Sequence, residues 1–131
     1  MRALLDTSFF VAAETGRPIS PPAGVDETEV SVVTVAELTV GVLLADESRR
    51  DRRLATLAAV ESGWEPLPVD IEVARAFARA FARIVASLRA RSRRVPVLDA
   101  LIAATASARD IPVVTQDRDF QAIPGIVVVR L

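Results

Sequence analysis

The chain alternates short apolar runs with longer segments in which apolar residues recur every three or four positions. The runs, at residues 2–5, 30–33, 64–69, 111–115 and 126–130, have the length and composition of short strands. Helical periodicity occupies residues 9–14, 34–45, 47–61, 70–91 and 97–109. Because strands separated by helices assemble into parallel sheets, we predict one α/β domain over residues 1–131. Its central parallel sheet should have four to five short strands flanked by helices.

The longest predicted helix, residues 70–91, carries two different stripes. Its apolar stripe is expected to pack in the core and comprises Phe77, Ala80, Phe81, Ile84, Val85 and Leu88. Arginine recurs every fourth residue on the other side, at Arg75, Arg79 and Arg83. The run 64–69 contains Pro66 and Pro68, which favour the edge of a sheet because proline donates no ladder hydrogen bond.

Four acidic residues occur where an apolar run ends or a predicted helix begins: Asp6, Glu37, Asp99 and Asp117. In parallel α/β sheets, ligands bind beyond the carboxyl ends of the strands, so the order of the elements allows these acids to meet there. Two carboxylates about 5 Å apart repel by about 3 kcal/mol at an effective dielectric constant near 20. A cluster of four would therefore need a cation, and oxygen ligands favour Mg²⁺ or Mn²⁺.

Each acid also has a local structural explanation. Asp6 could cap the following helix, Asp99 could complement a helix dipole, and Asp117 could form an Asx turn. Glu37 and Thr34 match a capping box. Such separate roles explain less well why all four acids occur at these positions. Asp6, Glu37 and Asp99 have the large apolar neighbours Leu5, Leu38 and Leu98, which favour partial burial. A partly buried carboxylate needs a partner, and the chain has no Lys or His to provide one.

Composition removes most other kinds of site. The chain contains no Cys, His or Lys, which excludes disulfides, zinc hydrolases, Ser-His-Asp triads, Walker phosphate loops and Schiff bases. Half of the residues are hydrophobic (51%) and the formal net charge is −1. Arginines cluster at 49–53 and 89–94, where they could contact phosphates or simply face solvent. The remaining chemistry is that of carboxylates, hydroxyls, Arg and Gln.

Four segments resemble, in order, the motifs of the PIN-domain ribonucleases, and more closely those of VapC-type toxins of bacterial toxin–antitoxin pairs. They are LLDTS (4–8), VTVAEL (33–38), VLDALIAATA (97–106) and VVTQDRDF (113–120). The resemblance implies a PIN-like fold in which Asp6, Glu37, Asp99 and Asp117 are the catalytic, metal-binding acids. It adds Asp119 as a further metal-binding acid. Ser8 and Thr115 match hydroxyl positions that support the metal ligands.

The same resemblance implies hydrolysis of RNA phosphodiester bonds with one or two Mg²⁺ or Mn²⁺ ions. In this interpretation Asp6 and Asp99 anchor the first ion, Glu37 assists, and Asp117 completes the cluster. The arginines ahead of Asp99 are expected to contact RNA phosphates: Arg91, Arg93 and Arg94. Two positions depart from the family pattern. Relatives often have a polar residue at the position of Leu98 and an Arg at the position of Gln116. Both leave the set of acids intact but bear on substrate preference.

The resemblance also implies partners. VapC-type toxins are inhibited by a small VapB-like antitoxin, and homodimers are typical of the family. We predict that a set of apolar residues divides between the core and a groove for such a partner: Val40, Val42, Leu43, Leu44 and Leu54. The sequence predicts no signal peptide and no membrane span, so we expect a cytoplasmic protein.

Other protein classes fit less well. A receiver domain needs a Lys near its last strands, a dehalogenase-like phosphatase needs an acid where Ser8 stands, and a dinucleotide-binding turn needs glycines absent after residue 5. The main alternative is a catalytically inert PIN-fold module that binds another protein. The complete set of acids favours the nuclease.

Overall fold

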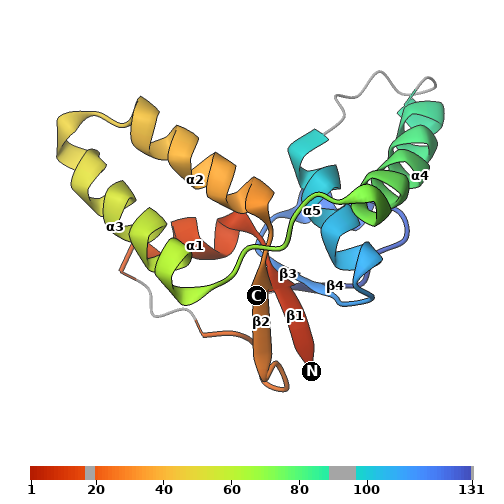
Figure 1. The fold of residues 1–131 in the computed structure, drawn as a ribbon, viewed down its shortest axis with the longest axis horizontal. Coiled ribbons are helices and arrows are strands. Elements are labelled where there is room, and N and C mark those ends of the chain that lie inside the picture. Colours follow the sequence, from red (N-terminus) through yellow and green to blue (C-terminus); the bar gives the residue numbers. More distant parts are fainter. Residues whose placement is uncertain (17–19, 89–96, 131) are drawn as a thin grey trace.

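A parallel sheet of four strands, in the order β2-β1-β3-β4, forms the centre of the protein (Figure 1). The computed structural model describes residues 1–16, 20–88 and 97–130. The strands are β1 (Arg2–Leu5), β2 (Glu27–Val30), β3 (Val113–Thr115) and β4 (Val128–Arg130). The helices are α1 (Thr7–Ala13), α2 (Val32–Leu44), α3 (Glu47–Gly63), α4 (Ile71–Leu88), α5 (Val97–Ala108) and the 3₁₀ helix η1 (Arg118–Ala122). The predicted α/β class and parallel sheet are confirmed.

The alternation of side chains along β1 divides the core into two layers. Ala3 and Leu5 pack with α1, α2 and α3, whereas Leu4 packs with α5 and the segment that follows β3. In Figure 1, α1–α3 accordingly lie on one side of the sheet and α4 and α5 on the other. All three of these β1 side chains are at most 1% exposed, so the strand is enclosed by helices on both faces.

The strand order reverses between β1 and β3. From β1 the chain proceeds to β2 on one side, and from β3 it proceeds to β4 on the other. The two strands are paired in parallel, with Leu5 opposite Val114, so their carboxyl ends emerge together. This is the switch point at which α/β sheets bind ligands. Asp6 and Asp117 both follow it closely.

The boundary between β2 and α2 differs from the prediction. The run 30–33 is not a strand, because β2 ends at Val30 and α2 begins at Val32. Ser31 is the N-cap, and its hydroxyl accepts a hydrogen bond from the Val33 N–H at 3.0 Å. The capping box of Thr34 and Glu37 is therefore wrong. Glu37 lies in the second turn of α2, where it has no capping role.

The predicted strand at 64–69 is reduced to a single bridge between Ser31 and Leu67. Leu67 donates its N–H to the Val30 carbonyl and accepts from the Val32 N–H. Pro66 and Pro68 on either side have no N–H to extend the pairing, which limits it to one residue.

Helix α4 packs on α5 through the apolar stripe that the sequence predicts. Ala76 is buried, while Phe77 and Phe81 are half-buried with ring centroids 5.0 Å apart. Arg79 and Arg83 are exposed. The expected stripe also includes Leu88, whose side chain lies outside the described residues.

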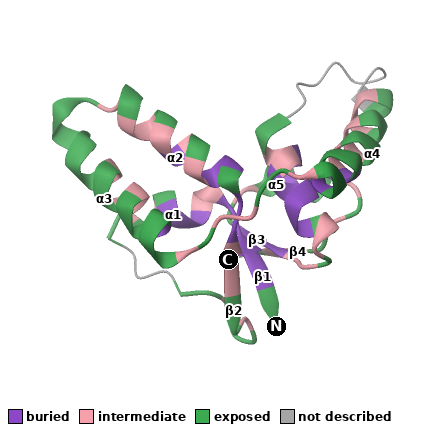
Figure 2. Cartoon of the chain, in the orientation of Figure 1, coloured by how far each residue is buried: buried purple, intermediate pink, exposed green. Residues whose placement is uncertain are grey.

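Figure 2 shows α3 mostly exposed and α2 partly exposed, and the exposed residues of these helices include several large apolar side chains. Leu43 is 74% exposed and Leu44 is 82% exposed. Val40 and Leu54 are about half exposed, and Val42 is half-buried.

Among the described residues, no helix is long and apolar enough to cross a membrane.

Candidate metal centre

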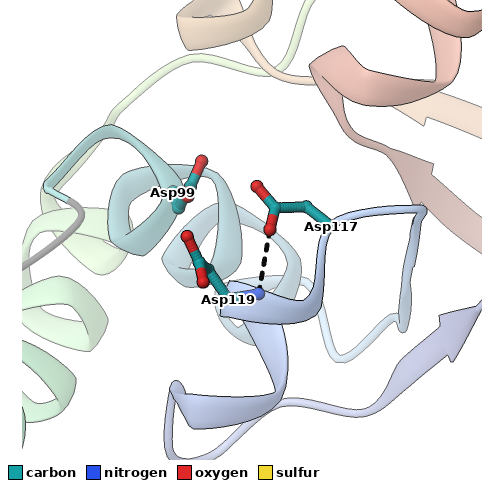
Figure 3. Close-up of side chains that lie close together, drawn as sticks. All are labelled: Asp99, Asp117 and Asp119. Carbon is teal, nitrogen blue, oxygen red and sulfur yellow. Dashed lines mark hydrogen bonds between the residues drawn. The ribbon is translucent and has the colours of Figure 1, made fainter.

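Three carboxyl groups gather beside the switch point of the sheet. Asp99 lies in the first turn of α5, Asp117 precedes η1, and Asp119 lies within it. One carboxylate oxygen from each lies within 4.8 Å of the others, and Figure 3 shows the three groups turned toward one another. Asp117 also accepts a hydrogen bond from the Asp119 N–H at 2.9 Å, which fixes the turn that carries both acids. Asp99 thus converges with two acids that lie 18 and 20 positions further along the sequence.

Asp6 is held at the end of β1 by two hydroxyl groups. Ser8 Oγ donates to Asp6 Oδ1 at 2.7 Å, and Thr115 Oγ1 donates to Oδ2 at 2.8 Å. Each hydroxyl also accepts a backbone N–H, from Gln116 and Asp117 respectively. A carboxylate oxygen only accepts, so each hydroxyl gives its one hydrogen to Asp6 and uses a lone pair for the backbone N–H. The loop after β3 is therefore tied to the first acid, and the Asp6 side chain makes no capping bond to α1.

Glu37 is positioned by threonines. Thr7 Oγ1 donates to Glu37 Oε1 at 2.7 Å and lies 3.1 Å from Thr34 Oγ1. Thr34 is fully buried and Thr7 is half-buried, so this arrangement is anchored in the packing between α1 and α2. Glu37 Oε2 accepts no hydrogen bond within the described part of the chain.

The acids act on one another electrostatically. Burial is the largest effect on Asp99 and, together with Asp117, Glu37, Asp6 and Asp119 in that order, raises its pKa from 3.8 to about 7. Burial likewise raises the pKa of Asp6, partly offset by the hydrogen bonds from Ser8 and Thr115. All four other acids thus contribute to the potential at Asp99, although only Asp117 and Asp119 belong to the group within 4.8 Å.

The structure shows which of these acids have a capping or turn role and whether that role explains their convergence. Asp117 does form the Asx turn, and Asp99 does lie at a helix start, but neither role requires the carboxylates to converge. Leu98 is 50% exposed, so it does not bury Asp99 as the sequence suggested. Within residues 1–16, 20–88 and 97–130, none of these acids forms an ion pair.

The remaining candidate residues divide in two groups. Ser8 and Thr115 contact Asp6 as described above, whereas Arg91, Arg93 and Arg94 lie outside the described residues. Sequence reasoning missed Thr7 as the partner of Glu37 and Thr34 as the partner of Thr7. The signal for Thr7 was its place directly after Asp6 in the D-T-S segment.

The donor set fits a divalent cation. These clustered carboxylates form no ion pair within the described residues, and the pKa of Asp99 is strongly raised. A hard metal ion would relieve both features. Asp99, Asp117 and Asp119 offer ligands directly, and Asp6 and Glu37 border them. The sequence contains no thiolate or imidazole ligand, so the ion would be of the Mg²⁺ or Mn²⁺ type.

The chain is similar to known proteins over nearly its whole length. The PIN domain family model matches residues 3–126. Ribonuclease VapC5 of Mycobacterium tuberculosis is 44% identical over 98% of this chain and 92% of its own length. Ribonuclease VapC4 of the same organism is 39% identical over 99% of this chain and 97% of its own. The crystal structure of VapBC-5 from M. tuberculosis, a member of the VapBC family of toxin-antitoxin systems, superposes with a TM-score of 0.74. That match is 41% identical and covers 99% of this chain and 97% of the other.

Proposed function

The chain belongs to the PIN domain family, and we propose that it is a metal-dependent endoribonuclease, the toxin of a VapBC-type pair. The relatives named ribonuclease support the hydrolysis of RNA phosphodiester bonds. The convergence of Asp99, Asp117 and Asp119 at the switch point is the single observation that carries the dependence on Mg²⁺ or Mn²⁺. Without it, the family match would be equally compatible with an inert fold.

We assign Asp99, Asp117 and Asp119 to hold the cation, with Asp6 beside them. A divalent ion in such a site lowers the pKa of water and stabilises negative charge on a leaving oxygen. Asp6 is held by Ser8 and Thr115 and so keeps the strand end and the loop after β3 in register. Glu37 Oε2 is free to accept a hydrogen bond from the attacking water and orient it toward phosphorus.

Thr7 should matter for this orientation. The Thr7→Val variant keeps the side-chain shape but removes the donor to Glu37 Oε1, and we expect the kcat of RNA cleavage to fall about 10- to 100-fold. Thr7→Ser retains the hydroxyl and should keep most of the activity. Steady-state cleavage with both variants, alongside Mn²⁺ affinity, is the measurement. An active Thr7→Val protein would show that Glu37 needs no such support.

The proposed function itself is tested on RNA. Purified protein with Mg²⁺ or Mn²⁺ should cut total RNA at a restricted set of sites, and sequencing the new ends identifies the substrate. EDTA should stop the reaction. A protein that leaves tRNA, ribosomal RNA and mRNA intact with either ion would contradict the proposal.

We further propose a VapB-like antitoxin as partner, bound at the apolar surface of α2 and α3. This surface comprises Val40, Leu43, Leu44 and Leu54, with Val42 at its border. Apolar side chains grouped in this way are typical of protein interfaces rather than of isolated surfaces. The solved VapBC relative is a toxin–antitoxin system, which supports this assignment. A homodimer in the cytoplasm is the assembly and location that we propose.

The alternative, an inert PIN-fold module, would use the same apolar surface without the acids. It leaves unexplained why three carboxylates converge within 4.8 Å and why they, with Asp6 and Glu37, raise the pKa of Asp99. A small domain gains no stability from such a cluster. We therefore favour the enzyme.

A further inference from the structure

An open groove of about 400 Å³ lies between α4, α5 and the segment 123–126. Its floor is largely apolar and combines small residues, among them Ala80, Ala103 and Ala104, with the larger Ile126. Arg79 and Arg83 form part of its lining from α4, and no carboxylate lines it. The arginines that the sequence places on the outer side of this helix thus border a groove rather than open surface alone.

The charge of this groove is unbalanced. Neither Arg79 nor Arg83 forms an ion pair with any residue in the described ranges. Four residues apart on a helix, their Cα atoms are separated by about 6 Å along the axis, which is comparable to the separation of adjacent phosphates on a nucleic-acid strand. The groove therefore offers two cations at phosphate spacing above an apolar floor.

The walls of the groove are the elements that carry the acids. Asp99 lies in the first turn of α5, and Ala103 and Ser107 of the groove follow it at one and two turns on the same side. Asp119 lies in η1, and Ile123 of the groove is four residues beyond. A strand whose scissile phosphate lies at the acid cluster would therefore meet the groove next along α5.

We propose that this groove binds single-stranded RNA flanking the cleaved bond, with Arg79 and Arg83 contacting successive phosphates and the apolar floor receiving a base or ribose. The inference rests on the proposed nuclease function. The acid cluster repels phosphates, so substrate binding requires cations nearby, and these two arginines supply them. The described structure thereby gives α4 a part in RNA binding that the sequence assigned to residues 91–94.

The test measures binding separately from cleavage. In an Asp99→Asn background, which prevents cutting, anisotropy of a short labelled single-stranded RNA is followed over a series of NaCl concentrations. Arg79→Gln with Arg83→Gln should weaken binding by about 10-fold or more and lower the salt slope by about 1.4, the loss of two phosphate contacts. The matched control removes two charges outside the groove, Arg52→Gln with Arg75→Gln, and should stay within about twofold of the parent.

A second pair of variants tests whether the groove itself contributes to RNA binding, independently of the arginine charges. Ser107→Phe fills the groove without changing charge and should weaken RNA binding, whereas Ala78→Phe on the exposed side of α4 should not. Equal RNA binding by the groove and control variants overturns the inference. The inference is also overturned if a groove variant loses self-association or antitoxin binding while its RNA affinity is unchanged. The cleavage assay on the unsubstituted protein is independent of both, so failure of the groove and failure of the nuclease function are distinguishable.

Discussion

The Asp99→Asn variant is expected to lose RNA cleavage by about 10³-fold while its metal-free fold becomes more stable. Asp99 is one of three acids whose oxygens lie within 4.8 Å of one another, so its amide cannot hold a divalent cation as the carboxylate does. Its pKa is raised to about 7, which means that ionisation at pH 8 opposes folding. Removing that charge should raise the free energy of unfolding by about 1–3 kcal/mol, after allowance for partial exposure.

Cleavage assays and urea unfolding at pH 8 in EDTA check both parts of this expectation. The control is Asp51→Asn, which removes the same charge from an exposed position on α3. It should alter neither activity nor stability. An Asp99→Asn protein that unfolds would show that Asp99 has a structural role, and one that cuts RNA normally would exclude it from the site.

The sequence was sufficient for the parts of the site that depend on element order. Asp6 and Asp117 follow apolar strands, and parallel strands place their carboxyl ends together, so their proximity could be predicted without coordinates. Asp99 could be placed at a helix start for a similar reason. The observed β1–β3 pairing accounts for the proximity of Asp6 and Asp117, and Asp99 does lie in the first turn of α5.

The prediction that failed concerns the start of α2, which lies a few residues earlier than expected. Because Ser31 rather than Thr34 caps α2, Glu37 moves from the first helical turn to the second, where its carboxylate faces Thr7. Local patterns could not distinguish these registers, since Ser31 and Thr34 both suit an N-cap. The choice is made by β2 ending at Val30 and by the hydrogen bonds of Leu67 on either side of Ser31, which are tertiary contacts.

The two hydroxyl groups beside Asp6 were predicted from the family resemblance and not from the order of the elements. Ser8 and Thr115 are more than 100 positions apart, yet both donate to Asp6 because β1 and β3 are neighbours. Asp119, which appeared secondary in the sequence, belongs to the group of three acids, while Asp6 borders it. Side-chain direction after a turn decides this, and the sequence pattern does not contain it.

The site also imposes a cost on the fold that varies with pH. The pKa of Asp99 and of Asp6 is raised by burial, so both groups bind protons more tightly in the folded protein than in the unfolded chain. Their effect is absent below about pH 4. As the pH rises from there to about 7, the unfolded state gives up protons first, and the stability of the metal-free protein should fall.

A divalent cation should reverse this loss. At pH 8, Mn²⁺ at about 100 times its dissociation constant should add about 2.7 kcal/mol of stability, which for a domain of this size corresponds to a rise in Tm of about 8–12 °C. At pH 5.5 the ion must displace the proton of Asp99, whose pKa is about 7, so its affinity should be roughly 30-fold lower.

Thermal unfolding at both pH values, with and without Mn²⁺, measures this coupling. The Asp117→Asn variant should lose most of the rise in Tm at pH 8, because it removes one of the three oxygens that lie together. Asp51→Asn should retain it. Since a bound ion stabilises only the state that holds its ligands in place, an equal rise in all three proteins would mean that Mn²⁺ binds elsewhere. No rise in the unsubstituted protein would show that these acids converge without holding a metal.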